Sequence, residues 1–201
     1  MTKNKKLKIA VTGNIGSGKS LFCKYLRDQN FQVIEADIIA KEILISSSHV
    51  KENIIKEFGA ESYLNNELNR KYLAENVFSN PVRLNKINSI VHPETIKEIN
   101  KLIEKVFVKE DIVFIEAALI YEADMEKLFD FVVLICADEK VRKQRKIKND
   151  NYSEEEFNKR NLNQISEEEK KKRADFVFEN NEGSIELKKK ADFLLKILHA
   201  L

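Results

Sequence analysis

The sequence predicts an α/β protein in which a five-stranded parallel sheet lies between layers of helices. Short apolar runs alternate along the chain with longer segments whose apolar residues recur at helical spacing. The short runs are apolar throughout, which is typical of strands buried on both faces of a parallel sheet. The chain has 201 residues, of which 43% are hydrophobic, so it can bury one substantial core.

The expected elements follow in order along the chain. Five segments are expected to be strands: Leu7–Thr12, Phe31–Ala36, Ile112–Glu116, Phe131–Cys136 and Phe176–Phe178. Helices are expected over residues 18–29, over most of 37–108, in the charged segment 138–173 and from Ser184 to the end. The long second segment is assigned by Ile96, Ile99, Ile103 and Val106, which recur at steps of three and four. The closing helix is assigned by Ile185, Leu187, Ala191, Leu194, Leu195 and Leu198.

Composition narrows the class of partner. Charged residues make up 34% of the chain, but the signs nearly cancel to a net charge of +2. Neither a nucleic-acid nor a membrane partner is therefore expected. The two cysteines, Cys23 and Cys136, form no CxxC pair, which favours a reducing compartment over a disulfide framework. The N-terminal apolar stretch is too short for a signal peptide, so we expect a cytoplasmic protein.

The first predicted strand leads into a phosphate-binding motif. Residues 13–20 read GNIGSGKS and fit G-x-x-x-x-G-K-[ST] between a strand and a helix, the context that this motif requires. Glycines let the backbone approach a ligand, and the N–H groups of the loop can then hold phosphate oxygens. Lys19 is expected to reach the β- and γ-phosphates, and the Ser20 hydroxyl to bind Mg²⁺. The expected nucleotide-binding residues are Gly13, Asn14, Ile15, Gly16, Ser17, Gly18, Lys19, Ser20 and, through its backbone, Leu21.

The alternative is a strand-to-helix turn that merely needs glycine, but the structural context favours nucleotide binding. The motif predicts a P-loop NTPase with three α/β/α layers, which binds ATP and Mg²⁺. GTPases also carry N-K-x-D to recognise guanine and D-x-x-G as a switch. Neither pattern occurs in this sequence, which disfavours a GTPase.

Asp37 follows the second predicted strand in the stretch IEADIIAKEI. The crevice beyond the carboxyl ends of parallel strands is where such sheets bind ligands. A carboxylate there, close to the γ-phosphate, can accept the proton of an attacking hydroxyl. Asp37 can equally serve as the N-cap of the next helix, and the residues alone leave both roles open.

Two further candidates are a basic segment and a strand-end carboxylate. Residues 140–150, KVRKQRKIKND, hold six Lys and Arg and lie between two predicted strands, as a lid over transferring phosphate would. A solvated basic helix face is the alternative. Glu116 ends the third predicted strand, where it can hold a metal-bound water or cap the next segment, and these two roles also stay open.

Several stretches together resemble the dephospho-CoA kinase family. They are VTGNIGSGKS, VIEADIIAKEI, ELNRKYLAENVFSN with IVHPETIKEI, ALIYEADMEKLFDFVVLICADEKVRKQR, and RNLNQISEEEKKKRADFVFENNEGS. The resemblance runs in order from residue 8 to about residue 190. It places the family's catalytic aspartate on Asp37, its substrate-binding residues on Arg70 and His92, and its lid arginine on Arg145. Other matched positions are Pro93, Arg160, Gln164, Lys170, Ala174, Asp175, Asn180 and Gly183.

This resemblance implies an enzyme that phosphorylates the ribose 3′-hydroxyl of dephospho-CoA with ATP, the last step of coenzyme A synthesis. It also implies one kinase domain over residues 1–201. The core would comprise about 1–40, 109–137 and 174–201, with a helical substrate-binding insertion at about 41–108 and a helical lid at about 138–173. The expected partners are dephospho-CoA and ATP. Two alternatives stay open, another kinase of the nucleoside-monophosphate-kinase-like class and an ATP-dependent switch protein without an acceptor.

Overall fold

The computed structural model describes residues 5–77 and 80–200. Phe78, part of a stretch that resembles the kinase family, lies outside the described residues. The chain divides into two compact units, the first made of Met1–Ile34 and Lys105–Leu201 and the second of Glu35–Glu104. The expected core and lid segments after residue 108 fall in the first unit. Most of the expected insertion falls in the second.

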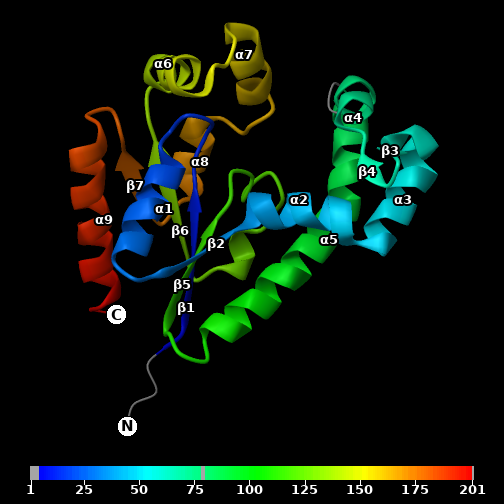
Figure 1. Cartoon of the computed structure of the whole chain (residues 1–201). Helices are drawn as coiled ribbons and strands as arrows, with labels where there is room; N and C mark the ends of the chain where they lie inside the picture. Colours follow the sequence, from blue (N-terminus) through cyan, green and yellow to red (C-terminus); the bar gives the residue numbers. More distant parts are fainter. Residues whose placement is uncertain (1–4, 78–79, 201) are drawn as a thin grey trace. The chain divides into compact units, whose positions relative to one another are not determined.

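A five-stranded sheet confirms the predicted α/β class. Its strands are β1 (Leu7–Thr12), β2 (Gln32–Glu35), β5 (Ile112–Glu116), β6 (Phe131–Cys136) and β7 (Phe176–Glu179). The order across the sheet is β2-β5-β1-β6-β7. β1 pairs in parallel with β5 and β6, and β6 pairs in parallel with β7 (Figure 1). The first strand is therefore central, and the chain that leaves its carboxyl end lies between two neighbouring strand ends.

Helices connect the strands of the first unit. They are α1 (Lys19–Asp28), α6 (Glu139–Asp150), α7 (Glu154–Leu162), α8 (Glu167–Arg173) and α9 (Ser184–Leu198), with a short 3₁₀ turn at Glu126–Leu128. Serine is the N-cap residue of two of the three helices in the charged segment. Ser153 and Glu156 form a reciprocal capping box on α7, and Ser166 accepts a hydrogen bond from the Glu169 amide on α8. Polar helices bury little apolar surface, so packing does not determine where they begin. Hydrogen bonds from capping side chains determine it instead.

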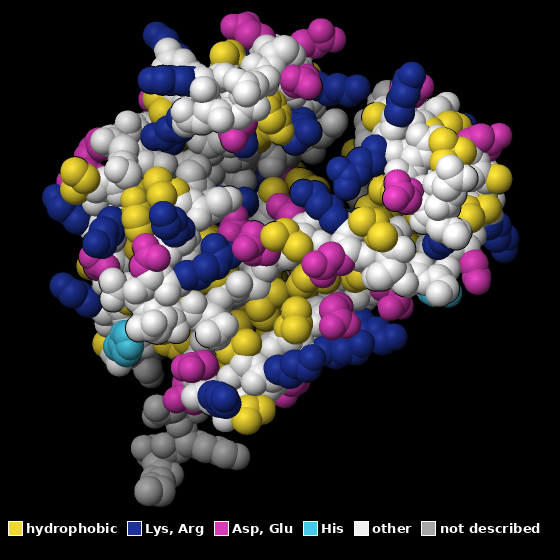
Figure 2. Space-filling model, in the orientation of Figure 1, with side chains coloured by type: hydrophobic (Ala, Val, Ile, Leu, Met, Phe, Trp, Pro, Cys, Tyr) yellow, Lys and Arg dark blue, Asp and Glu magenta, His cyan; other side chains and the backbone are white. Residues whose placement is uncertain are grey.

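The surface mixes charges of both signs. Lys and Arg side chains lie among Asp and Glu side chains over the face shown in Figure 2. Within residues 5–77 and 80–200, no helix is both long enough and apolar enough to cross a membrane.

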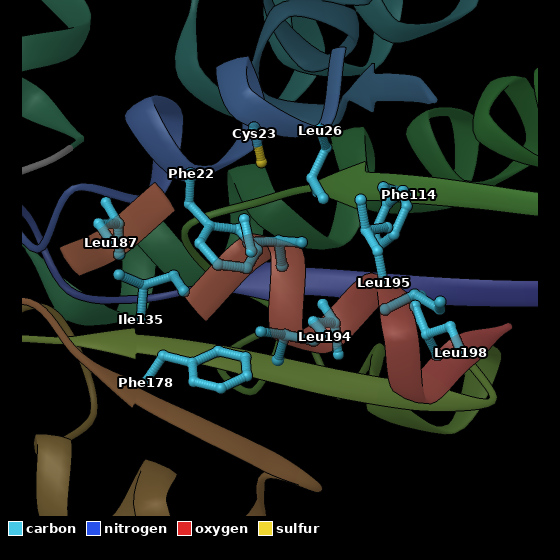
Figure 3. Packing of buried hydrophobic residues seen from close by; sticks show 14 of the residues in the cluster. Phe22, Cys23, Leu26, Phe114, Ile135, Phe178, Leu187, Leu194, Leu195 and Leu198 are labelled. Carbon is cyan, nitrogen blue, oxygen red and sulfur yellow. The ribbon is translucent and has the colours of Figure 1, made fainter. Parts of the chain in front are cut away.

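The main core lies between the sheet and the pair α1 and α9. Phe22, Leu26 and Leu194 are fully buried against inward-facing residues of β1, β5 and β6 (Figure 3). Phe22 stacks on Phe178 of β7 with ring centroids 5.8 Å apart. Because α1 begins at Lys19, within the phosphate-binding motif, this packing fixes the last residues of the motif to the sheet.

The second unit is mainly helical, as the sequence predicts. Its helices are α2 (Ala36–Ser46), α3 (Ser48–Phe58), α4 (Arg70–Asn76) and α5 (Pro81–Val106). A two-stranded hairpin, β3 (Tyr63–Leu64) and β4 (Glu67–Leu68), lies beside a 3₁₀ turn at Ala60–Ser62 and was not expected. Its turn residues, Asn65 and Asn66, both have positive φ, of 50° and 69°. Strands of two residues are too short to show a period of two, so only the Asn-Asn pair could have indicated the turn.

Candidate active site

The motif of residues 13–20 joins β1 to α1, as predicted. Gly18 precedes α1 in a left-handed conformation with φ of 100°, and a Cβ atom there would clash with the Asn180 side-chain amide. The first-turn N–H groups of a helix have no partner within the helix, so the start of α1 presents donors and a positive dipole end. These two properties suit an anion such as phosphate.

Lys19, Ser20 and Glu116 meet at the carboxyl ends of β1 and β5. The Ser20 hydroxyl donates to Glu116 Oε1 at 2.6 Å, and Lys19 Nζ lies 3.2 Å from the same oxygen. Glu116 itself pairs in register with Val11 of β1 and is only 5% exposed. The structure shows Glu116 in contact with the loop, and its two predicted roles, holding a metal-bound water or capping the next segment, stay predictions.

The pKa of Glu116 is lowered from its usual value of 4.5. Burial alone would raise the pKa, but the positive charge of Lys19 and the hydrogen bonds donated by Ser20 and Lys19 outweigh it. Arg27 adds an ion pair at 3.6 Å from Oε2. Glu116 is therefore a carboxylate at neutral pH, and it holds Lys19 and Ser20 toward one another.

Arg145 lies beside the same loop. Its guanidinium donates to the Asn180 carbonyl oxygen at 2.7 Å and to the Ser17 carbonyl oxygen at 3.5 Å. The Asn180 side-chain amide donates to that Ser17 oxygen at 2.8 Å. Partial burial lowers the pKa of Arg145. The structure thus brings the predicted lid arginine to the phosphate-binding loop, together with Asn180, to which the sequence assigned no role.

Asp37, Arg70 and His92 all belong to the second unit. Asp37 is exposed in the first turn of α2, and Glu35 is the N-cap of that helix, so the alternative role of Asp37 as an N-cap is wrong. Arg70 is exposed at the start of α4. His92 is half-buried on α5 before Pro93, and burial lowers its pKa. Their roles in substrate binding and catalysis stay predictions.

The residues around Ser20 fit a magnesium ion. Mg²⁺ prefers hard oxygen ligands, which the Ser20 hydroxyl and the Glu116 carboxylate provide. Glu116 Oε2 is buried, and no residue of the described chain donates a hydrogen bond to it. Among those residues no cluster of three or more acidic, histidine or cysteine side chains could hold a metal by itself. A metal here would need oxygens from a bound nucleotide or from water.

Known proteins share both the sequence and the fold. The family model described as dephospho-CoA kinase matches residues 7–186. A dephospho-CoA kinase of Chlamydia caviae is 36% identical over 192 residues, which cover 92% of this chain and 93% of that protein. One of Fusobacterium nucleatum is 38% identical over 186 residues, covering 92% of this chain and 94% of that protein.

Solved structures agree with these matches. A crystal structure from Thermus thermophilus superposes with a TM-score of 0.83 at 33% identity and covers 98% of each chain. A dephospho-CoA kinase from Campylobacter jejuni gives 0.62 at 25% identity, covering 96% of this chain and 97% of the other. A shikimate kinase from Acinetobacter baumannii, at 15% identity and a TM-score of 0.55, shares the fold. Since the family match spans nearly the whole chain and includes the phosphate-binding loop, the protein belongs to the dephospho-CoA kinase family.

Proposed function

We propose that the protein transfers the γ-phosphoryl group of ATP to the ribose 3′-hydroxyl of dephospho-CoA, giving CoA and ADP. The observation that supports this most directly is the meeting of Lys19, Ser20 and Glu116 at the start of α1 in a chain of this kinase family. A site of this kind works by positioning reactants and neutralising charge.

The loop and Lys19 hold the phosphates of ATP in this proposal. The amides at the start of α1 donate to phosphate oxygens, and Lys19 exchanges its contact with Glu116 for the β- and γ-phosphates. Arg145 neutralises charge on the transferring group. Ser20 and Glu116 would hold Mg²⁺, which when bound neutralises charge on the phosphate oxygens.

Asp37 acts as the general base. Its carboxylate takes the proton from the 3′-hydroxyl as the oxygen forms a bond to the γ-phosphorus. The bond between that phosphorus and the bridging oxygen breaks, and its electron pair leaves with ADP. Arg70 and His92 bind the acceptor in the second unit. The proposal also includes reaction in the cytoplasm, which the composition predicts.

An acceptor screen tests the substrate. Purified protein with Mg-ATP is offered dephospho-CoA, an analogue that lacks the 3′-hydroxyl, AMP, or no acceptor, and ADP and phosphorylated product are followed by mass. ADP and CoA formed only with dephospho-CoA are expected. Phosphorylation of the 3′-deoxy analogue would contradict the proposed position, and equal ADP without an acceptor would indicate an ATPase.

A further inference from the structure

The N–H and C=O groups of Ile15, in the middle of the phosphate-binding loop, each form a hydrogen bond with a distant side chain. The Ile15 amide donates to Gln164 Oε1 at 2.8 Å, and the Ile15 carbonyl oxygen accepts from the Arg142 guanidinium at 3.2 Å. Gln164 lies between α7 and α8, and Arg142 lies in α6. Side chains more than a hundred residues away in the sequence therefore fix both polar groups of one loop residue.

Arg142 is built into this position. It is 4% exposed, and its guanidinium also donates to the Ala137 carbonyl oxygen at 2.9 Å and to Asn161 Oδ1 at 2.8 Å. A buried guanidinium is stable only where its donors are satisfied, and the planar fork reaches several acceptors at once. The backbone of Arg142 adds a steric limit, because a Cβ atom on Gly16 would lie 2.6 Å from the Arg142 carbonyl oxygen.

The segment Gln164–Ile165 is itself anchored. The Ile165 carbonyl oxygen accepts from the Asn14 side chain at 3.3 Å, and the Ile165 amide donates to Glu122 Oε1 at 2.9 Å. Lys170, fully buried, lies 2.9 Å from that same carboxylate oxygen. Because Glu122 has a buried cation and a backbone donor, Gln164 is held in place before any nucleotide binds.

We propose that Gln164 and Arg142 are positioning residues for ATP binding. They fix the middle of the loop through their hydrogen bonds with the Ile15 amide and the Ile15 carbonyl oxygen. The Ile15 amide is then bound to Gln164 and does not donate to phosphate. When either hydrogen bond is lost, the peptide unit that made it can rotate. This rotation disorders the neighbouring N–H groups of the loop that bind the phosphates. The inference rests on the ATP binding of the proposed function and requires no acceptor.

The test uses the full chain with Gln164→Met, which keeps side-chain length but removes the amide oxygen acceptor. Gln29→Met, at an exposed position after α1, is the matched control. Affinity for ADP is measured by calorimetry, and exchange of the Ile15 amide hydrogen is measured by NMR without nucleotide. Because one hydrogen bond is lost, a roughly three- to tenfold weaker affinity is expected, with faster Ile15 exchange. The control should match the wild type in both measurements.

Two further variants separate positioning from general loss of structure. Gln164→Glu keeps an oxygen acceptor and should retain slow Ile15 exchange. Arg142→Lys keeps the charge but cannot reach three acceptors, and it should weaken ADP affinity while KM for dephospho-CoA stays unchanged. Unchanged ADP affinity in Gln164→Met, unchanged Ile15 exchange, or fast exchange in Gln164→Glu would each overturn the proposal. If dephospho-CoA proves not to be the acceptor, the affinity and exchange measurements still decide it.

Discussion

Glu116 joins the two loop side chains that meet phosphate and metal in the proposed reaction. One carboxylate oxygen accepts from both Lys19 and Ser20, and the other lies near Arg27. A buried carboxylate with such partners stabilises the folded protein only while it is ionised. Removal of this single charge should therefore change both stability and nucleotide binding.

The pH dependence of stability tests this charge. The pKa of Glu116 is lower in the folded protein than its usual 4.5, so its contribution is present above about pH 4.5 and is lost as the pH falls below that value. Glu116→Gln should lower the free energy of unfolding by about 1–3 kcal/mol at pH 7, because an acceptor remains but the charge does not. In urea unfolding, this difference should shrink as the pH falls below about 4.5.

Glu154→Gln provides the matched control for this measurement. Glu154 pairs with Lys143 at 2.8 Å but is 70% exposed, and such a pair contributes less than about 1 kcal/mol at either pH. A difference between wild type and Glu116→Gln that stays constant with pH would mean that the ionised carboxylate is not the stabilising group.

Asp37 is the residue on which the chemical step depends in the proposal. Asp37→Asn removes the base but keeps a side chain of similar size at an exposed position. Because general base catalysis contributes roughly 10²–10⁴ in rate, kcat should fall by at least about a hundredfold, while affinity for ATP stays close to wild type. Steady-state kinetics with calorimetry checks this. Wild-type turnover in the variant would rule out the role of Asp37 as the base.

At the scale of elements, the strands that border the loop could be predicted from sequence because they are buried on both faces. Leu7–Thr12, Ile112–Glu116 and Phe131–Cys136 are mostly apolar runs, which are typical of strands buried in a parallel sheet. Individual positions on helices were less predictable. Ile185, one of the residues that assign the closing helix, is 74% exposed, because it lies two positions before the buried Leu187 and so faces the opposite side of α9.

The strand–loop–helix element makes a prediction of its own. Gly18 and Gly183 both have positive φ, 100° and 101°, but a Cβ atom would clash with Asn180 only at Gly18. Alanine should cost about 1–2 kcal/mol in backbone strain at Gly18, which is left-handed, and about 1–3 kcal/mol at Gly183, whose ψ of −167° lies in a region that is essentially restricted to glycine. Only Gly18→Ala should also lose ADP affinity, because Asn180 must move away from the loop. Equal affinity in both variants, measured by calorimetry, would show that the Asn180 contact is not needed.

At the scale of the whole molecule, the sequence indicates which residues belong to the candidate site more readily than it indicates which hydrogen bonds join them. The glycine pattern placed Lys19 and Ser20 on the loop, because that motif has a fixed backbone shape. The contacts of Glu116, Asn180 and Gln164 could not be predicted, because they join residues about 100 or more positions apart through side chains that are common elsewhere. Distant polar contacts of this kind follow from packing rather than from local pattern.

The two compact units divide the proposed reaction between them. The first holds the phosphate-binding loop, Glu116 and Arg145, and the second holds Asp37, Arg70 and His92. In the proposal, ATP binding by the loop is assigned to residues of the first unit, and the acceptor and the base are assigned to residues of the second. An assay that follows both products separates these two requirements.

The most direct test is the ratio of CoA to ADP formed from dephospho-CoA and Mg-ATP, measured by mass in wild type and in Lys19→Met. One CoA for each ADP is expected in the wild type. Almost no product is expected in the variant, whose folding is checked by circular dichroism, because the cation that meets the β- and γ-phosphates is gone. ADP without CoA in the wild type, or undiminished CoA formation in folded Lys19→Met, would contradict the proposed function.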